Sequence, residues 1–175
     1  MSCVGCHEHR LSAPPRVPKA MALNRPISEV DPGPDGSNPL SYPLLVQPVL
    51  DRLCVKCHSG DKPAGPENNP ITLTGEPEGQ YSKSYNVLAK RVPFSSWGTL
   101  DGNGEPATQP ERFGARASEL MKMLLAGHHE VQLNADDLNR LTTWMDANAL
   151  FYGTFNPEDQ ARQLRGERIE GPALQ

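Results

Sequence analysis

Cys54-Val55-Lys56-Cys57-His58 is the stretch of sequence that says most about the fold of this chain. It follows a short, mainly apolar run, and two residues separate its cysteines. The same pattern occurs near the start of the chain as Cys3-Val4-Gly5-Cys6-His7. A cysteine pair at this spacing, followed at once by histidine, is typical of c-type haem attachment. The chain has four cysteines, and the two motifs use all of them.

The spacing has a chemical reason. The two thiols of one motif add to the two vinyl groups of a single haem, and a short helical turn then places the next side chain under the iron as its proximal imidazole ligand. The sequence therefore predicts two covalently attached haem c groups. The predicted attachment residues are Cys3, Cys6 and His7 for the first haem and Cys54, Cys57 and His58 for the second.

Three other uses of paired cysteines fit less well. A zinc site can use two such pairs, but it does not need a histidine directly after both. Thioredoxin-like redox motifs belong to units of alternating strand and helix, and no such pattern is evident. A disulfide within either pair would be strained. Haem attachment is the interpretation that explains every residue of the motif.

The composition also favours a cofactor-dependent fold. Hydrophobic residues make up 37% of the 175 residues and aromatic residues 6%, which is little for a packed core. The 18 prolines and 15 glycines predict long irregular connections. Two large apolar macrocycles would supply the missing core. The net charge of −4 and the lack of a long apolar run predict neither a nucleic-acid binder nor a membrane span.

Helical patterns surround the second motif, so we expect a mostly α, loop-rich, cytochrome c-like domain. Helices are expected from Tyr42 or Pro48 to Cys57, over 81–91, over 117–126 and after Asn134 as an N-cap. The expected divisions are 1–40 for the first motif and a proline-rich linker, 41–155 for the haem domain and 156–175 for a polar tail that frays. In the helix after Asn134, Leu138, Leu141 and Trp144 are expected to pack against the second haem or against the helix that carries it.

Two adjacent histidines are candidates for the sixth ligand of the second iron. His128 and His129 follow a helix-ending Gly127 and lie between two apolar helices. Since neighbouring side chains point in different directions, one of them can face the haem, and we favour His128 over His129 as the distal ligand. Met121 and Met123 are the alternatives, because methionine is the other common axial ligand in cytochromes. An open site is the remaining alternative.

The first haem has no evident distal ligand. His9 is too close to His7 to reach the opposite face of the same ring, and we interpret it as a solvated or hydrogen-bonded side chain. Met21 or another linker residue could bind this iron, the site could be open, or the ligand could belong to sequence outside this chain.

The order of these motifs resembles the haem-binding C-terminal portion of the hydrazine synthase alpha subunit and its planctomycete relatives. The similarity extends over nearly the whole chain to about residue 155. The stretches that carry it are Ser2–Glu8, Pro32–Gly36, Val49–Gly60, Gly114–Ser118, Gly127–His129 and Leu141–Asn148. The family implies an extracytoplasmic protein in which a β-propeller precedes two haem c units, and this chain is similar to its C-terminal portion alone.

The resemblance also carries expectations about the site. It implies a bis-histidine second haem whose distal ligand comes from the segment that contains His128. It implies that the first haem can be catalytic, with a tyrosine a few residues beyond the proximal histidine. Here that region reads Glu8-His9-Arg10-Leu11-Ser12, without tyrosine, and the nearest one is Tyr42. We therefore carry over electron transfer rather than hydrazine synthesis.

The sequence predicts a dihaem c-type cytochrome domain for single-electron transfer with a redox partner protein or an adjoining domain. One alternative is a hydrazine synthase-like oxidoreductase with an open first haem, and another is a structural haem domain that docks on a propeller. Because haem c is attached outside the cytoplasm, we expect an extracytoplasmic location. No signal peptide precedes Cys3, so we expect a piece of a longer secreted protein or a misplaced gene start.

Overall fold

A computed structural model describes residues 24–29, 32–61, 70–94 and 111–171. The chain divides into two compact units, residues 1–31 and 32–175. The first unit contributes only residues 24–29 to the described part, so the first cysteine motif, His9 and Met21 lie outside the described residues. The fold and the site below belong to the second unit.

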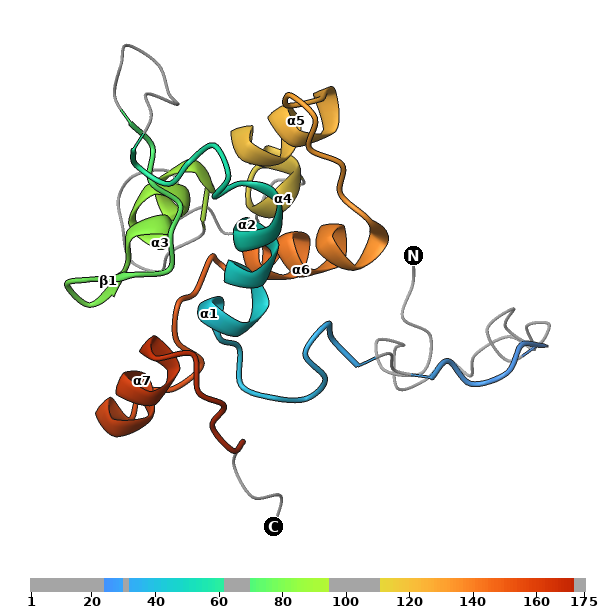
Figure 1. The fold of residues 1–175 in the computed structure, drawn as a ribbon. Coiled ribbons are helices and arrows are strands. Elements are labelled where there is room, and N and C mark those ends of the chain that lie inside the picture. Colours follow the sequence, from blue (N-terminus) through green and yellow to red (C-terminus); the bar gives the residue numbers. More distant parts are fainter. Residues whose placement is uncertain (1–23, 30–31, 62–69, 95–110, 172–175) are drawn as a thin grey trace. The chain divides into compact units, whose positions relative to one another are not determined.

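Helices dominate the described part of the second unit (Figure 1), which confirms the expected mostly α class. In chain order the elements are α1 (Tyr42–Leu45), α2 (Gln47–Leu53), β1 (Pro77–Glu78), β2 (Tyr81–Ser82), α3 (Lys83–Leu88), the 3₁₀ turn η3 (Ala89–Arg91), α4 (Gly114–Ala117), α5 (Glu119–Ala126), α6 (Ala135–Asp146) and α7 (Pro157–Leu164). Long connections separate these short helices, in keeping with the high proline and glycine content.

The helices start where the local sequence provides caps. Pro43 and Pro48 lie in the first turns of α1 and α2, where a missing backbone N–H costs nothing. The Ser118 hydroxyl accepts a hydrogen bond from the Met121 backbone N–H at the start of α5. Asn134 caps α6 as predicted, and Asp137 completes a reciprocal capping box with it. The expected helix over 117–126 is thus interrupted at Ser118, where α4 ends and α5 begins.

A small hairpin occupies part of the segment expected to be helical over 81–91. Strands β1 and β2 pair antiparallel, with Pro77 opposite Ser82 and Glu78 opposite Tyr81. Gly79, in the turn between them, has a φ of +70°, which glycine adopts without steric cost. The helix therefore begins at Lys83, after the Ser82 hydroxyl has accepted a hydrogen bond from the Tyr85 N–H.

The expectation that segment 156–175 frays is wrong for α7. Asn156 caps this helix by accepting hydrogen bonds from the backbone N–H groups of Glu158 and Asp159. Gln163 is 1% exposed; its side chain donates to the Leu40 carbonyl and accepts from the Gly153 N–H. A buried amide with two backbone partners, rather than an apolar stripe, holds the helix on the unit, and hydrophobic periodicity could not reveal that.

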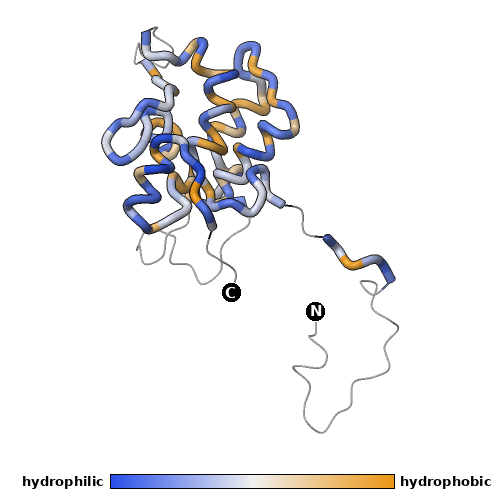
Figure 2. The backbone as a smooth tube through the Cα atoms, turned by 60° about the horizontal axis from the view of Figure 1, so that its bottom comes forward, coloured by the Kyte–Doolittle hydropathy of each residue, from blue (hydrophilic) through white to orange (hydrophobic). Residues whose placement is uncertain are grey.

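An aromatic cluster forms the centre of the core. Trp144 and Tyr42 are fully buried and their ring centroids lie 5.2 Å apart, while Tyr85 packs edge-on to Tyr42 at 5.1 Å. The Trp144 indole N–H donates to the Leu150 carbonyl at 3.0 Å. Trp144 therefore fastens α6 to α1, next to the helix that carries the second motif. Apolar and polar positions alternate along the helices of this unit (Figure 2), as expected for elements that each cover a small core.

Among the described residues, no helix is long and apolar enough to cross a membrane.

Candidate cofactor-binding site

The second motif directly follows helix α2, and its backbone continues the helical hydrogen bonding. The Cys54 N–H donates to the Leu50 carbonyl at 2.8 Å, and the His58 N–H donates to the Cys54 carbonyl at 2.9 Å. These hydrogen bonds fix the positions of Cys54, Cys57 and His58 in the turn that follows the end of α2 at Leu53. The next described segment fixes the end of the motif, because the Leu73 N–H donates to the His58 carbonyl at 2.8 Å.

The two thiols of the motif are free and differ in their surroundings. Cys54 is half-buried and Cys57 is exposed, and no disulfide joins them. Burial, and to a smaller extent the neighbouring Cys57, raise the pKa of the Cys54 thiol to about 11. Both sulfurs border the same cleft and are available for covalent attachment.

The histidine pair lies in the connection between α5 and α6. Gly127 ends α5 with a φ of +99°. His129 then adopts a left-handed backbone with a φ of +51°, and the Val131 N–H donates to the His128 carbonyl at 3.1 Å. This tight turn separates the two side chains, whose rings lie at 73° to each other. His128 is half-buried, whereas His129 is exposed.

His58 and His128 face each other across the cleft. Their rings are nearly parallel, with an interplanar angle of 17°, and their centroids are 6.1 Å apart. Two imidazoles bound end-on to one iron would have centroids about 6 Å apart, since each metal–nitrogen bond is about 2 Å long. The observed separation therefore fits an axial pair.

The electrostatics of the site favour a neutral imidazole at His128. The His128 pKa is lowered, mainly by burial and further by the nearby His129 and His58 rings. A neutral ring is the form that binds a metal. Nδ1 of His58 is buried and has no hydrogen-bond partner among the described residues.

The cleft between the two histidines is apolar. Its enclosed volume is about 70 Å³, and it is continuous with a wider, more open space of about 1220 Å³ that His58 and His128 also line. Apart from the two cysteines and the three histidines, its lining is entirely apolar. These lining residues are Val49, Leu50, Leu53, Leu73, Leu88, Leu120, Met123, Leu124, Val131, Leu133 and Leu141. Such a lining suits the faces of a macrocycle and excludes water from its centre.

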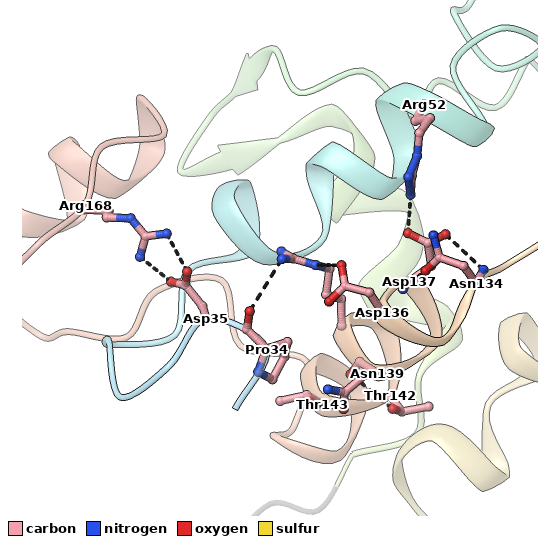
Figure 3. Close-up of polar contacts among 11 residues, drawn as sticks. Pro34, Asp35, Arg52, Asn134, Asp136, Asp137, Asn139, Thr142, Thr143 and Arg168 are labelled. Carbon is pink, nitrogen blue, oxygen red and sulfur yellow. Dashed lines mark hydrogen bonds and ion pairs between the residues drawn. The ribbon is translucent and has the colours of Figure 1, made fainter. Parts of the chain in front are cut away.

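Charged side chains stand only at the wider mouth of the cleft. The positive ones there are Arg52, Lys56 and Arg91, and the negative ones are Glu119 and Glu130. Of these side chains, Arg52 also forms an ion pair with Asp137 at the start of α6 (Figure 3).

A metal-ion site of the zinc type needs three or four clustered side-chain ligands. Within residues 24–29, 32–61, 70–94 and 111–171, no group of three or more His, Cys, Asp and Glu side chains is arranged to hold a metal ion. The geometry at the motif is instead a facing pair of imidazoles with two thiols at the edge of an apolar cleft.

The structure thus brings together Cys54, Cys57, His58 and His128, and it places His129 at the same cleft but exposed. Of the two methionine alternatives, Met121 is 4% exposed and belongs to the core, whereas Met123 lines the cleft. Leu138 packs against the core and Leu141 lines the cleft. Which side chain binds iron stays a prediction.

Sequence reasoning missed the opposite wall of the cleft. Leu73 comes from an extended segment and Leu88 from the end of α3, and both are buried. The sequence around Leu73 and Leu88 has no hydrophobic periodicity that would show whether these residues line a cleft or belong to the ordinary core. The pair of Arg52 and Asp137 was also missed as a pair, because nothing local in the sequence links these two residues.

Comparison of the chain with protein-family models, with curated proteins and with solved structures finds no match in any of the three.

Proposed function

We propose that this chain is a cytochrome c-like dihaem module that transfers single electrons. The observation that carries the proposal is the facing of His58 and His128 across an apolar cleft that the two motif thiols border. In this proposal Cys54 and Cys57 bind the second haem covalently, His58 is its proximal ligand and His128 its distal ligand. Cys3, Cys6 and His7 hold the first haem by the same motif.

When bound, a haem c supplies a one-electron couple at its iron. The chain's own residues then set the conditions for that couple. The leucine and valine lining excludes water, and two neutral imidazoles leave no open position for a substrate. Cys57, exposed at the motif, marks the side of the cleft nearest to solvent, where a redox partner could approach.

The proposal includes an extracytoplasmic location, because haem c is attached outside the cytoplasm. It also includes a redox partner, either another protein or an adjoining domain. Both the location and the redox partner are inferred from the haem c attachment that the two motifs predict.

The test is covalent attachment. The full chain, expressed with a signal peptide and a haem c maturation system, should gain the mass of two haems. The Cys54→Ala/Cys57→Ala chain should gain one, and Cys3→Ala/Cys6→Ala should also gain one. A wild-type mass equal to that of the bare chain would overturn the proposal, and a gain of one haem would limit it to a single site.

A further inference from the structure

A single carboxylate joins the two parts of the chain that carry the facing histidines. Asp137 is 2% exposed, and it forms an ion pair with Arg52 from the last turn of α2. Its other oxygen accepts a hydrogen bond from the Asn134 backbone N–H at 3.2 Å. Figure 3 shows the Arg52 side chain directed at this carboxylate, with Asn134 beside it.

The positions of these residues in the chain matter. Arg52 immediately precedes Leu53 and the cysteine motif, so its backbone is continuous with the turn that bears His58. Asn134 is the N-cap of α6 and ends the connection that bears His128. The ion pair therefore links the end of α2, which leads to His58, with the start of α6, which follows the connection that bears His128.

The pair also differs from ordinary surface ion pairs. Arg52 keeps 51% of its side chain exposed while its partner has only 3% exposed, so loss of the guanidinium would leave a buried charge without compensation. In the neighbouring pair of Arg140 and Asp136 the carboxylate side chain is 62% exposed, and both residues lie within α6. That second pair cannot set the distance between α2 and the His128 connection, which makes it a matched control.

We propose that Arg52 and Asp137 are positioning residues that hold His58 and His128 at the separation required for an axial pair. This inference rests on the proposed function, because it concerns the same haem site. The pair acts through the two supports and touches neither ring. Without it, apolar packing alone would hold the His128 connection and the start of α6 near α2, and the distal imidazole would dissociate more often.

The test uses carbon monoxide, which binds ferrous haem only after the distal ligand leaves. The second haem's signal in the full chain is identified as the one lost in Cys54→Ala/Cys57→Ala. Asp137→Asn and Arg52→Gln should speed its carbon monoxide binding by about 10-fold, which corresponds to about 1.4 kcal/mol of lost stabilisation of the bound distal imidazole. Arg52→Lys keeps the charge and should restore most of the wild-type rate. Asp136→Asn and Arg140→Gln should leave the rate unchanged.

The variants Arg52→Gln and Asp137→Asn should also act as a unit, so that the double variant is no faster than the faster single variant. Arg52→Gln keeps a hydrogen-bond donor beside Asp137 at a half-exposed position, so it is the second variant to measure if Asp137→Asn does not fold. If these variants lower the melting temperature but bind carbon monoxide at the wild-type rate, the pair is only structural and the positioning role is wrong. If the wild-type second haem is high-spin or absent, the proposed function fails at this site, and the inference fails with it.

Discussion

The imidazole rings of His58 and His128 lie nearly parallel, 6.1 Å apart between centroids, although one follows α2 and the other follows α5. The relationship depends on two supports: the turn that continues α2 and the glycine-ended connection before α6. It distinguishes the two adjacent histidines, since only His128 is directed toward the motif while His129 is exposed.

The first prediction separates these two histidines. His128→Asn should convert the second haem from low-spin to high-spin and open it to cyanide, because the distal imidazole is lost. His129→Asn should leave the spin state unchanged, and asparagine tolerates the positive φ at that position. Absorption and electron paramagnetic resonance spectra of the ferric protein measure both. The reverse pattern would assign the distal role to His129, and no change in either would move it to Met123.

The second prediction concerns the aromatic core. Trp144→Ala should lower the free energy of unfolding by about 3 kcal/mol, as for a large buried aromatic side chain truncated in a core. The change removes ring contacts with Tyr42 and leaves the Leu150 carbonyl without its donor. Chemical denaturation of the haem-loaded chain measures the loss. Phe155→Ala is the control, because this side chain is fully exposed and should change stability by less than about 0.5 kcal/mol. A similar loss in both variants would contradict the assignment of Trp144 to the core.

The third prediction follows from the buried phenols. Burial raises the pKa of Tyr85 to about 12, and it raises the pKa of Tyr42 still further. The protonated forms are therefore favoured in the folded state, while an unfolded tyrosine ionises near 10. The stabilisation is fully present below pH 10 and falls as the pH rises from about 10 towards 12.

Denaturant titrations across that range measure the slope of the free energy of unfolding against pH. Tyr42→Phe/Tyr85→Phe should flatten the slope, because neither ring can then ionise. The cost of the change at neutral pH includes the hydrogen bond from Tyr85 to the Ala149 carbonyl. An equally steep slope in the double variant would show that other groups cause the alkaline loss.

The fourth prediction concerns the attachment of α7. Gln163→Ala should lower the free energy of unfolding by about 2 kcal/mol, because the Leu40 carbonyl and the Gly153 N–H both lose their buried partner. Gln160→Ala is the matched control in the same helix; its side chain is half-exposed and makes one bond, to the Thr154 carbonyl. Water can replace that single partner, so the cost should be clearly smaller. Equal losses would indicate that helix propensity, and not the buried amide, is responsible.

By itself, the sequence predicted the chemistry that we propose for the motif, and it predicted the position of most helices. The order Cys54, Cys57, His58 requires no tertiary information, because one helical turn brings these residues together. Asn134 and its first-turn aspartates predicted the start of α6 for the same local reason. Gly127 likewise marked the end of α5.

The tertiary structure decided everything that depends on residues distant in the chain. It placed His128 rather than His129 opposite His58, since the direction of each side chain follows from the positive φ values at Gly127 and His129. It formed the hairpin before α3, and it ordered α7 through one buried glutamine. It also paired Arg52 with Asp137, because a salt bridge between two helices leaves no periodic trace in the sequence of either one.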